Sequence, residues 1–155
     1  MNVLFVCTGN TCRSPMAEGY LKHLLKVNNI ANVNVVSAGT HAHDESPASE
    51  ESIKAMNVFE IDISAHKSKL VSKETLEWAN LIVGMTYLHV QSILTLFGFE
   101  HKKKLKILHE FDQKNTDVVD PFGGDKKIYM SCFEEMKPAI DNIFAEIVSM
   151  LDKAN

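Results

Sequence analysis

The chain has 155 residues, of which 45% are hydrophobic and 23% are charged, and its formal net charge at pH 7 is −4. This length is typical of one domain, here residues 1–155, and the acidic balance argues against nucleic acid or an anionic membrane as a partner. Three cysteines do not make a disulfide framework. Because the chain has neither a signal-peptide pattern nor an apolar run long enough to cross a membrane, we expect a cytoplasmic protein.

The first predicted strand, Val3–Val6, is a continuous apolar run that leads into Cys7. A short loop, residues 8–13, follows it and ends at Ser14 and Pro15, which are typical of a helix start. A strand, a tight loop and a helix N-terminus in this order predict an anion site. Both the loop amides and the helix dipole favour a bound negative charge there.

Cys7 and Arg13 could carry out chemistry on a phosphate in this loop. The positive potential of the loop favours the thiolate of Cys7, which can attack phosphorus. The planar guanidinium of Arg13 can hold two phosphate oxygens and follow them into the transition state. Ser14 could donate to the Cys7 sulfur and help it to leave. Gly9 allows a positive φ and a close approach of the backbone, and Asn10 tolerates the left-handed conformation.

Metal and nucleotide sites explain these residues less well. Cys7 and Cys12 have the spacing of half a zinc site, but the sequence has no second Cys or His pair at ligand spacing. The loop also lacks the G-x4-G-K-[ST] pattern of a Walker A site. Two histidines and two acids in residues 41–46 could be taken for a metal cluster, although a solvated loop explains them better. We therefore expect no metal and no cofactor.

The rest of the chain alternates predicted helices and strands. We predict helices at Pro15–Val27, Pro47–Asn57, Lys73–Trp78, Thr86–Phe97 and Ile128–Lys153, and strands at Asn34–Ser37, Leu81–Met85 and Leu105–Leu108, the last of which could extend to Phe111. Pro138 predicts a kink or a restart in the last helix, and Cys132 on that helix is expected to be a buried structural thiol. The alternation predicts an α/β fold with a doubly wound parallel sheet, whose ligands bind beyond the strand C-termini.

A second candidate site lies late in the chain, at Asp117–Gly124. Asp120 precedes Pro121, which holds its backbone extended and stiff. A carboxylic acid in this position could protonate an oxygen or nitrogen leaving group. Asp117 is the competing candidate, and a loop acid that caps a turn is the alternative without a function.

These motifs resemble those of the low-molecular-weight protein phosphatases. The stretch Val6–Glu18 matches that family without a gap, and Ser37–Thr40, Asn80–Thr86 and Asp120–Gly124 match it further along. The resemblance implies a phosphatase I-like, flavodoxin-like sandwich of four parallel strands with helices on both faces. It also implies a monomer that hydrolyses phosphorylated protein substrates through a phosphocysteine intermediate.

The resemblance implies roles for individual residues as well. The implied phosphate-binding loop comprises Thr8, Gly9, Asn10, Thr11, Cys12 and Ser14. Asp120 would donate a proton to the leaving group and then activate the water that hydrolyses phosphocysteine. Ser37 would steady the loop through Asn10, and Phe122 would form one wall of the cleft. Cys12 could trap Cys7 in a reversible disulfide under oxidation.

Thr11 bears on the choice of substrate. Tyrosine-directed members of the family commonly carry a larger apolar residue at this position. A subgroup of bacterial relatives that remove phosphate from arginine has Thr there and Asp-Pro-Phe-Gly-Gly later, and this sequence has both features. It also lacks the bulky aromatic residue that tyrosine-specific members often place in the segment equivalent to residues 41–46.

We therefore expect a protein-arginine phosphatase, with a protein tyrosine phosphatase on the same scaffold as the alternative. Arsenate reductases share this scaffold but need relay cysteines, which residues 80–91 lack. A module that only binds phosphoproteins, or that carries phosphocysteine without turnover, is an alternative of a different class. Such a module would not need the acid at Asp120.

Overall fold

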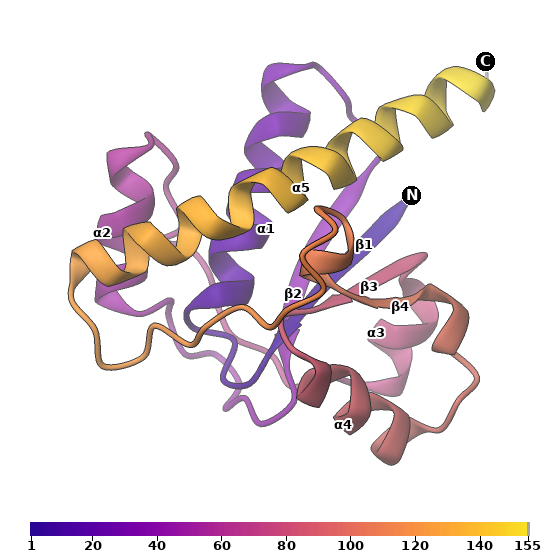
Figure 1. Cartoon of the computed structure of the whole chain (residues 1–155), viewed down its shortest axis with the longest axis horizontal. Coiled ribbons are helices and arrows are strands. Elements are labelled where there is room, and N and C mark those ends of the chain that lie inside the picture. The colour runs from indigo at the N-terminus through magenta and orange to yellow at the C-terminus, as the bar shows by residue number, and fades with distance from the viewer. Residues whose placement is uncertain (155) are drawn as a thin grey trace.

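The computed structural model describes residues 1–154, which form a three-layer α/β sandwich (Figure 1). In this part of the chain the middle layer is a sheet of four strands, β1 (Asn2–Cys7), β2 (Asn34–Gly39), β3 (Leu81–Gly84) and β4 (Leu105–Ile107). The strand order is β2-β1-β3-β4, and every neighbouring pair is parallel. The doubly wound, four-stranded parallel sheet expected from the sequence is confirmed.

The connections between strands are helical. The α-helices of residues 1–154 are α1 (Arg13–Val27), α2 (Glu50–Val58), α3 (Lys73–Trp78), α4 (Tyr87–Phe97) and α5 (Lys126–Ala154), and the 3₁₀ turns are η1 (Lys102–Lys104) and η2 (Leu108–Glu110). No helix in this part of the chain is long and apolar enough to cross a membrane.

The helices cover both faces of the sheet, with α1, α2 and α5 on one face and α3 and α4 on the other (Figure 1). Strand β1 contributes to both cores. Phe5 belongs to the core under α1, α2 and α5, whereas Leu4 and Val6 belong to the core under α3 and α4. Because both faces of a parallel strand are buried, β1 is continuously apolar in sequence rather than alternating.

The C-terminal ends of β1, β2 and β3 place the candidate site. From β1 the chain passes to β2 on one side of it, and β3 lies on the other side. Cys7, the last residue of β1, pairs with Gly39, and Val6 pairs with Gly84. A crevice opens where the strand order reverses, and ligands of doubly wound sheets bind there. Cys7 therefore stands at the position where this fold accepts a ligand.

Helix α2 begins at Glu50 and not at Pro47, so the predicted start was wrong. Ser49 is its N-cap, and the Ser49 hydroxyl accepts a hydrogen bond from the Ser52 amide at 3.2 Å. The Ser49 amide itself donates to the carbonyl oxygen of Thr11 at 2.8 Å. A side-chain cap, rather than the fixed φ of a proline, sets the first turn of this helix. The same residue joins α2 to the loop after β1.

Strand β4 ends at Ile107, and the possible extension to Phe111 does not form. The Glu110 carboxylate accepts a hydrogen bond from the Ile107 amide at 2.6 Å. This bond closes the 3₁₀ turn η2 directly after the strand. The apolar pattern of the segment could not show this, because a side chain that bonds back to the backbone competes locally with strand pairing.

Helix α5 runs through Pro138 as one helix, so the predicted restart does not occur. Met136 and Ala139, on either side of the proline, are both fully buried in one core. Packing therefore outweighs the backbone hydrogen bond that a proline removes. Cys132 lies on the same helix and is 7% exposed, as expected for a structural thiol. Burial raises its pKa to about 12, which keeps it in the unreactive thiol form.

Candidate active site

The end of the loop between β1 and α1 lies beside the sulfur of Cys7, at which the loop begins. Cys7 Sγ and Ser14 Oγ are 2.9 Å apart, and both residues are buried. The N-cap of α1, Cys12, makes no capping bond with its side chain. Within residues 1–154 no acceptor is bonded to the amide N–H groups of residues 9–12. These amides and the N-terminal end of the α1 dipole can therefore bind an anion beside Cys7.

Asn10 gives the loop its shape. Its φ is 57°, so it adopts the left-handed conformation that we expected it to tolerate. Its Nδ2 donates to Ser14 Oγ and to Ser37 Oγ, each at 2.9 Å, and its Oδ1 accepts from the Lys69 amide at 2.9 Å. Because Ser14 Oγ already accepts from Asn10, the Ser14 hydroxyl proton is free to point at Cys7 Sγ.

Gly9 uses neither the positive φ nor the close backbone approach that its lack of a side chain allows. Its φ is not in the positive range, and a Cβ added there would meet Thr11 Oγ1 at 3.8 Å, an ordinary contact. Asn10 makes the reversal instead, because hydrogen bonds from its side chain offset the cost of the left-handed backbone. The close approach occurs at Gly39, whose Cβ would lie 2.4 Å from the Thr8 carbonyl oxygen.

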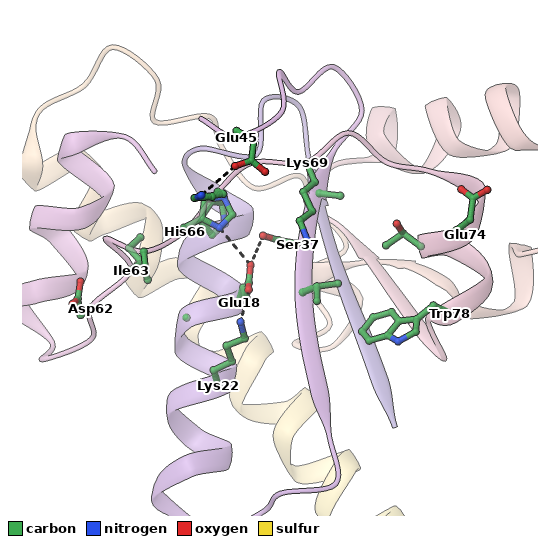
Figure 2. A pocket seen from close by; sticks show the side chains of 17 residues that line it. Glu18, Lys22, Ser37, Glu45, Asp62, Ile63, His66, Lys69, Glu74 and Trp78 are labelled. Atoms are coloured by element: carbon green, nitrogen blue, oxygen red, sulfur yellow. Dashed lines mark hydrogen bonds and ion pairs between the residues drawn. The ribbon is translucent and has the colours of Figure 1, made fainter. Parts of the chain in front are cut away.

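Behind the loop, the Glu18 side chain lies between those of Ser37 and His66 (Figure 2). The Glu18 carboxylate accepts a hydrogen bond from the Ser37 hydroxyl, and His66 Nε2 donates to the Asn10 carbonyl oxygen at 2.8 Å. These side chains border a cavity of about 800 Å³ between α1, β2 and the 62–78 segment. Of the described residues, those lining it do not include Cys7, so the cavity lies behind the anion site and not at its mouth.

The side chain of Arg13 lies across the loop and reaches the 117–120 segment. It is 5% exposed, and its Nη1 donates to the Val118 carbonyl oxygen at 2.9 Å. Its Nη2 lies 3.7 Å from Asp120 Oδ2, and the Asp120 side chain is 56% exposed. The fold thus brings a carboxyl group from late in the chain to the rim of a site built by the first strand.

Asp117 and Asp120 have different partners, which separates the two candidate acids. Asp117 Oδ1 accepts a hydrogen bond from the Tyr87 amide at 2.9 Å, at the first residue of α4. Asp120 Oδ1 accepts from the Phe122 amide at 3.1 Å, which leaves Oδ2 toward Arg13. Asp117 therefore anchors its segment to α4, while Asp120 faces the guanidinium.

The predicted cleft and redox residues lie around the same loop. Phe122 follows Asp120 closely and is 83% exposed, so its ring stands out from the rim. Thr11 is half-buried, with its Oγ1 3.7 Å from Cys12 Sγ. Cys12 Sγ lies 3.2 Å from the Tyr129 hydroxyl, and burial raises the pKa of Tyr129 to about 12. The three cysteines of the chain are all unpaired and buried.

His89, which we did not predict as a site residue, packs against the loop from helix α4. It is 4% exposed, and its Nε2 lies 2.8 Å from Thr8 Oγ1. Burial, and then the nearby charge of Arg13, lower its pKa to about 4. A signal was present, because a Thr-x-x-His start to a helix directly after β3 places a histidine at the edge of the sheet where ligands bind.

A cysteine in a phosphate-sized loop, at the switch point of a parallel α/β sheet and opposite an acid, defines a cysteine-dependent phosphatase. Comparison with known proteins agrees with the geometry. The family model for low molecular weight phosphotyrosine protein phosphatase matches residues 2–153. The chain therefore belongs to that family and is a protein phosphatase that acts on phosphorylated proteins.

Arginine and tyrosine phosphatases are similar to this chain to about the same degree. A protein-arginine-phosphatase of Bacillus subtilis (strain 168) is 36% identical over 148 residues, which cover 95% of this chain and 97% of that protein. A YwlE arginine phosphatase, solved as a C7S mutant with a phosphorylated active-site serine, superposes with a TM-score of 0.89 and 35% identity over 95% of each chain. The low molecular weight protein tyrosine phosphatase of T. tengcongensis gives a TM-score of 0.89 and 37% identity over 94% of this chain and 99% of that one.

Proposed function

We propose that this enzyme removes phosphate from phosphoarginine in proteins, with Cys7 as its nucleophile. The observation that carries the substrate assignment is the 36% identity to a protein named protein-arginine-phosphatase over 95% of this chain. Thr11 supports the same assignment, because tyrosine-directed members commonly have a larger apolar residue there. The tyrosine phosphatase of T. tengcongensis is equally similar, so phosphotyrosine is the second candidate.

In the first step, the Cys7 thiolate forms a bond to phosphorus while the bond from phosphorus to the arginine nitrogen breaks. The amides of residues 9–12 and the Arg13 guanidinium hold the three phosphoryl oxygens, on which charge accumulates in the transition state. Asp120 gives its proton to the departing nitrogen, so that this nitrogen does not leave with a negative charge. The P–N bond is labile once its nitrogen is protonated, which suits an acid in this position.

In the second step, the Asp120 carboxylate takes a proton from a water molecule, whose oxygen attacks phosphorus. The S–P bond breaks, and phosphate and the Cys7 thiolate are released. The Ser14 hydroxyl, which lies 2.9 Å from Cys7 Sγ, donates to the sulfur as negative charge returns to it. A module that only binds phosphoproteins would perform neither step, and a phosphocysteine carrier would stop after the first.

The substrate assignment is tested by comparing kcat/KM for phosphoarginine and phosphotyrosine in the same protein substrate. We expect the wild type to prefer phosphoarginine, and Thr11→Ile to shift the ratio toward phosphotyrosine by about tenfold, since a pocket change of this size shifts selectivity by one or a few kcal/mol. A preference of the wild type for phosphotyrosine would overturn the assignment. Cys7→Ser is the control and should abolish steady hydrolysis of p-nitrophenyl phosphate.

We also propose that the enzyme acts as a cytoplasmic monomer. The side chains described above all come from one chain, so the site does not require a second copy. The unpaired Cys7 and Cys12 suit a reducing compartment. Under oxidation, Cys12 remains our proposed partner for Cys7 in a reversible disulfide. A protein that released one equivalent of product and then stopped would instead be a phosphocysteine carrier.

A further inference from the structure

Helix α4 holds the side chain of Thr8 in place through one histidine. Thr8 follows the proposed nucleophile directly, and it is exposed. His89 lies in the first turn of α4 and is 4% exposed. The bond between His89 Nε2 and Thr8 Oγ1, at 2.8 Å, joins the buried imidazole of α4 to the exposed start of the loop.

The bonds around His89 decide which atom of this pair is the donor. The Thr86 amide donates to His89 Nδ1 at 3.1 Å, so Nδ1 carries a lone pair. A neutral imidazole with an accepting Nδ1 has its proton on Nε2. Nε2–H therefore donates to Thr8 Oγ1. This direction holds at neutral pH, because burial and Arg13 lower the pKa of His89 to about 4, against the opposing charges of Asp117 and Asp120.

The segment that carries the proposed general acid is tied to the helix that carries His89. The Val118 amide donates to the Met85 carbonyl oxygen at 2.9 Å, which lays the segment before Asp120 across the end of β3. The bond from the Tyr87 amide to Asp117 then ties this segment to the first turn of α4. The leaving group must depart on the side where Asp120 can reach it, and Asp120 follows a segment that is tied to the helix holding Thr8.

The chemistry of the Thr8 oxygen suits a guanidinium. A hydroxyl oxygen has two lone pairs, and His89 Nε2–H uses one of them. The other lone pair can accept a further donor at the mouth of the site. A guanidinium carries only N–H donors, whereas the aryl group of a phosphotyrosine has none. An oxygen fixed as an acceptor can therefore distinguish these two leaving groups.

We propose that Thr8 Oγ1 accepts a hydrogen bond from a guanidinium N–H of phosphoarginine and that His89 is the positioning residue that aims it. The inference deepens the proposed function and rests on it. It assigns substrate selectivity to a second threonine in addition to Thr11, and it gives the buried imidazole of α4 a role that needs no proton transfer.

The test measures kcat/KM for a phosphoarginine protein and for p-nitrophenyl phosphate, whose leaving group has no N–H donor. Thr8→Val keeps the shape of the side chain and removes the hydroxyl, and Thr8→Ser keeps the hydroxyl as the matched control. We expect Thr8→Val to lower the ratio of the two kcat/KM values about tenfold, the usual weight of a lost bond to a charged donor, mainly through KM. Thr8→Ser should retain most of the wild-type ratio.

The role of His89 is tested by a double-mutant cycle with His89→Phe. If His89 acts through Thr8, His89→Phe lowers the ratio in the wild-type background but not in the Thr8→Val background. Additive losses would overturn its positioning role. Should His89→Phe fail to fold, the Thr8 variants alone still decide the main proposal.

Three outcomes overturn the proposal for Thr8. An equal loss of kcat/KM on both substrates would mean that the hydroxyl serves the phosphoryl group that they share, and no loss on either substrate would mean that it contacts neither leaving group. In both cases the wild type still hydrolyses phosphoarginine, so the proposed function survives. If the wild type does not hydrolyse phosphoarginine at all, the proposed function and this inference fail together.

Discussion

His89 couples the stability of the protein to pH. Its pKa is about 4 in the folded protein, against an ordinary value of 6.5, because of burial and then Arg13. The unfolded chain therefore binds the His89 proton more tightly, and unfolding takes up a proton between these two pH values. The stabilising contribution is fully present above pH 6.5 and is lost as the pH falls toward 4.

We predict that a fall in pH from 7 to 5 lowers the free energy of unfolding by about 2 kcal/mol through the protonation of His89 alone. Urea denaturation of the wild type and of His89→Phe at both pH values measures this, since the other six histidines are common to both proteins. The stability gap between them should narrow by about 2 kcal/mol at pH 5. A gap that is the same at both pH values contradicts the prediction.

Single residues also show what could be predicted from sequence. The left-handed Asn10 was predictable, because its short amide side chain can bond to nearby backbone. The helix start at Thr86 could have drawn attention to His89, but its bond to Thr8 was not predictable, because Thr8 is 81 residues away in the chain. A hydrophobic or catalytic pattern within one segment says nothing about a bond across two elements. Local backbone preferences could be inferred from the residues alone, whereas the long-range contact of Asn10 with Ser37 was expected only from the family resemblance.

At the scale of elements, the end of β2 sets the position of the phosphate loop. A Cβ on Gly39 would lie 2.4 Å from the Thr8 carbonyl oxygen and 3.0 Å from the Asn10 amide nitrogen. Both are backbone atoms, which cannot rotate away as a flexible side chain can. Any side chain at this position must therefore displace the loop from the strand beside it.

We predict that Gly39→Ala destabilises the protein by about 1–3 kcal/mol and lowers kcat for p-nitrophenyl phosphate at least tenfold. Gly9→Ala is the matched control for stability, because its Cβ would meet no atom closer than 3.8 Å. It should change the free energy of unfolding by less than about 1 kcal/mol. Denaturant titrations give both stabilities, and equal effects of the two substitutions would show that the close contact does not govern the loop.

The elements themselves were predictable where a continuous apolar run or a helical stripe defined them. Their boundaries were not, and three cases share a cause. Side-chain bonds from Ser49 and Glu110 begin α2 and end β4, and packing around Pro138 keeps α5 continuous. In each case a tertiary or side-chain interaction overrode a backbone preference that is correct on average. Boundaries of this kind depend on partners that a local pattern does not contain.

For the whole molecule, alternation of strands and helices was sufficient to predict a parallel sheet with helices on both faces. It was also sufficient to place Cys7 at the crevice, because the first strand of such a sheet borders the switch point. The pairing of Arg13 with Asp120, 3.7 Å apart, could not come from spacing. The family motif suggested both residues, but their meeting depends on how the 117–120 segment crosses β3 and α4.

The two cores of the molecule differ in size, and we predict that they differ in stability. The core under α1, α2 and α5 includes the buried residues through which α1 and α5 pack on each other. The core under α3 and α4 contains far fewer buried residues. In α4 only His89 and Ile93 are buried, and Leu88 and Leu96 are exposed. Less buried apolar surface means a lower free energy of local opening.

Native-state hydrogen exchange measures this difference directly. We expect amides in the middle of α4 to exchange through local opening, with free energies below the global value, while those in the middle of α1 and α5 exchange only on global unfolding. A low free energy of opening for α4 would affect substrate specificity, because α4 carries His89, which holds the Thr8 side chain in place. Opening of α4 would release the Thr8 side chain while Cys7 and Arg13 stay held by β1 and α1. Equal protection of α1 and α4 would mean that both layers unfold as one unit. The Thr8 side chain would then be held in place for as long as the phosphate loop itself stays folded.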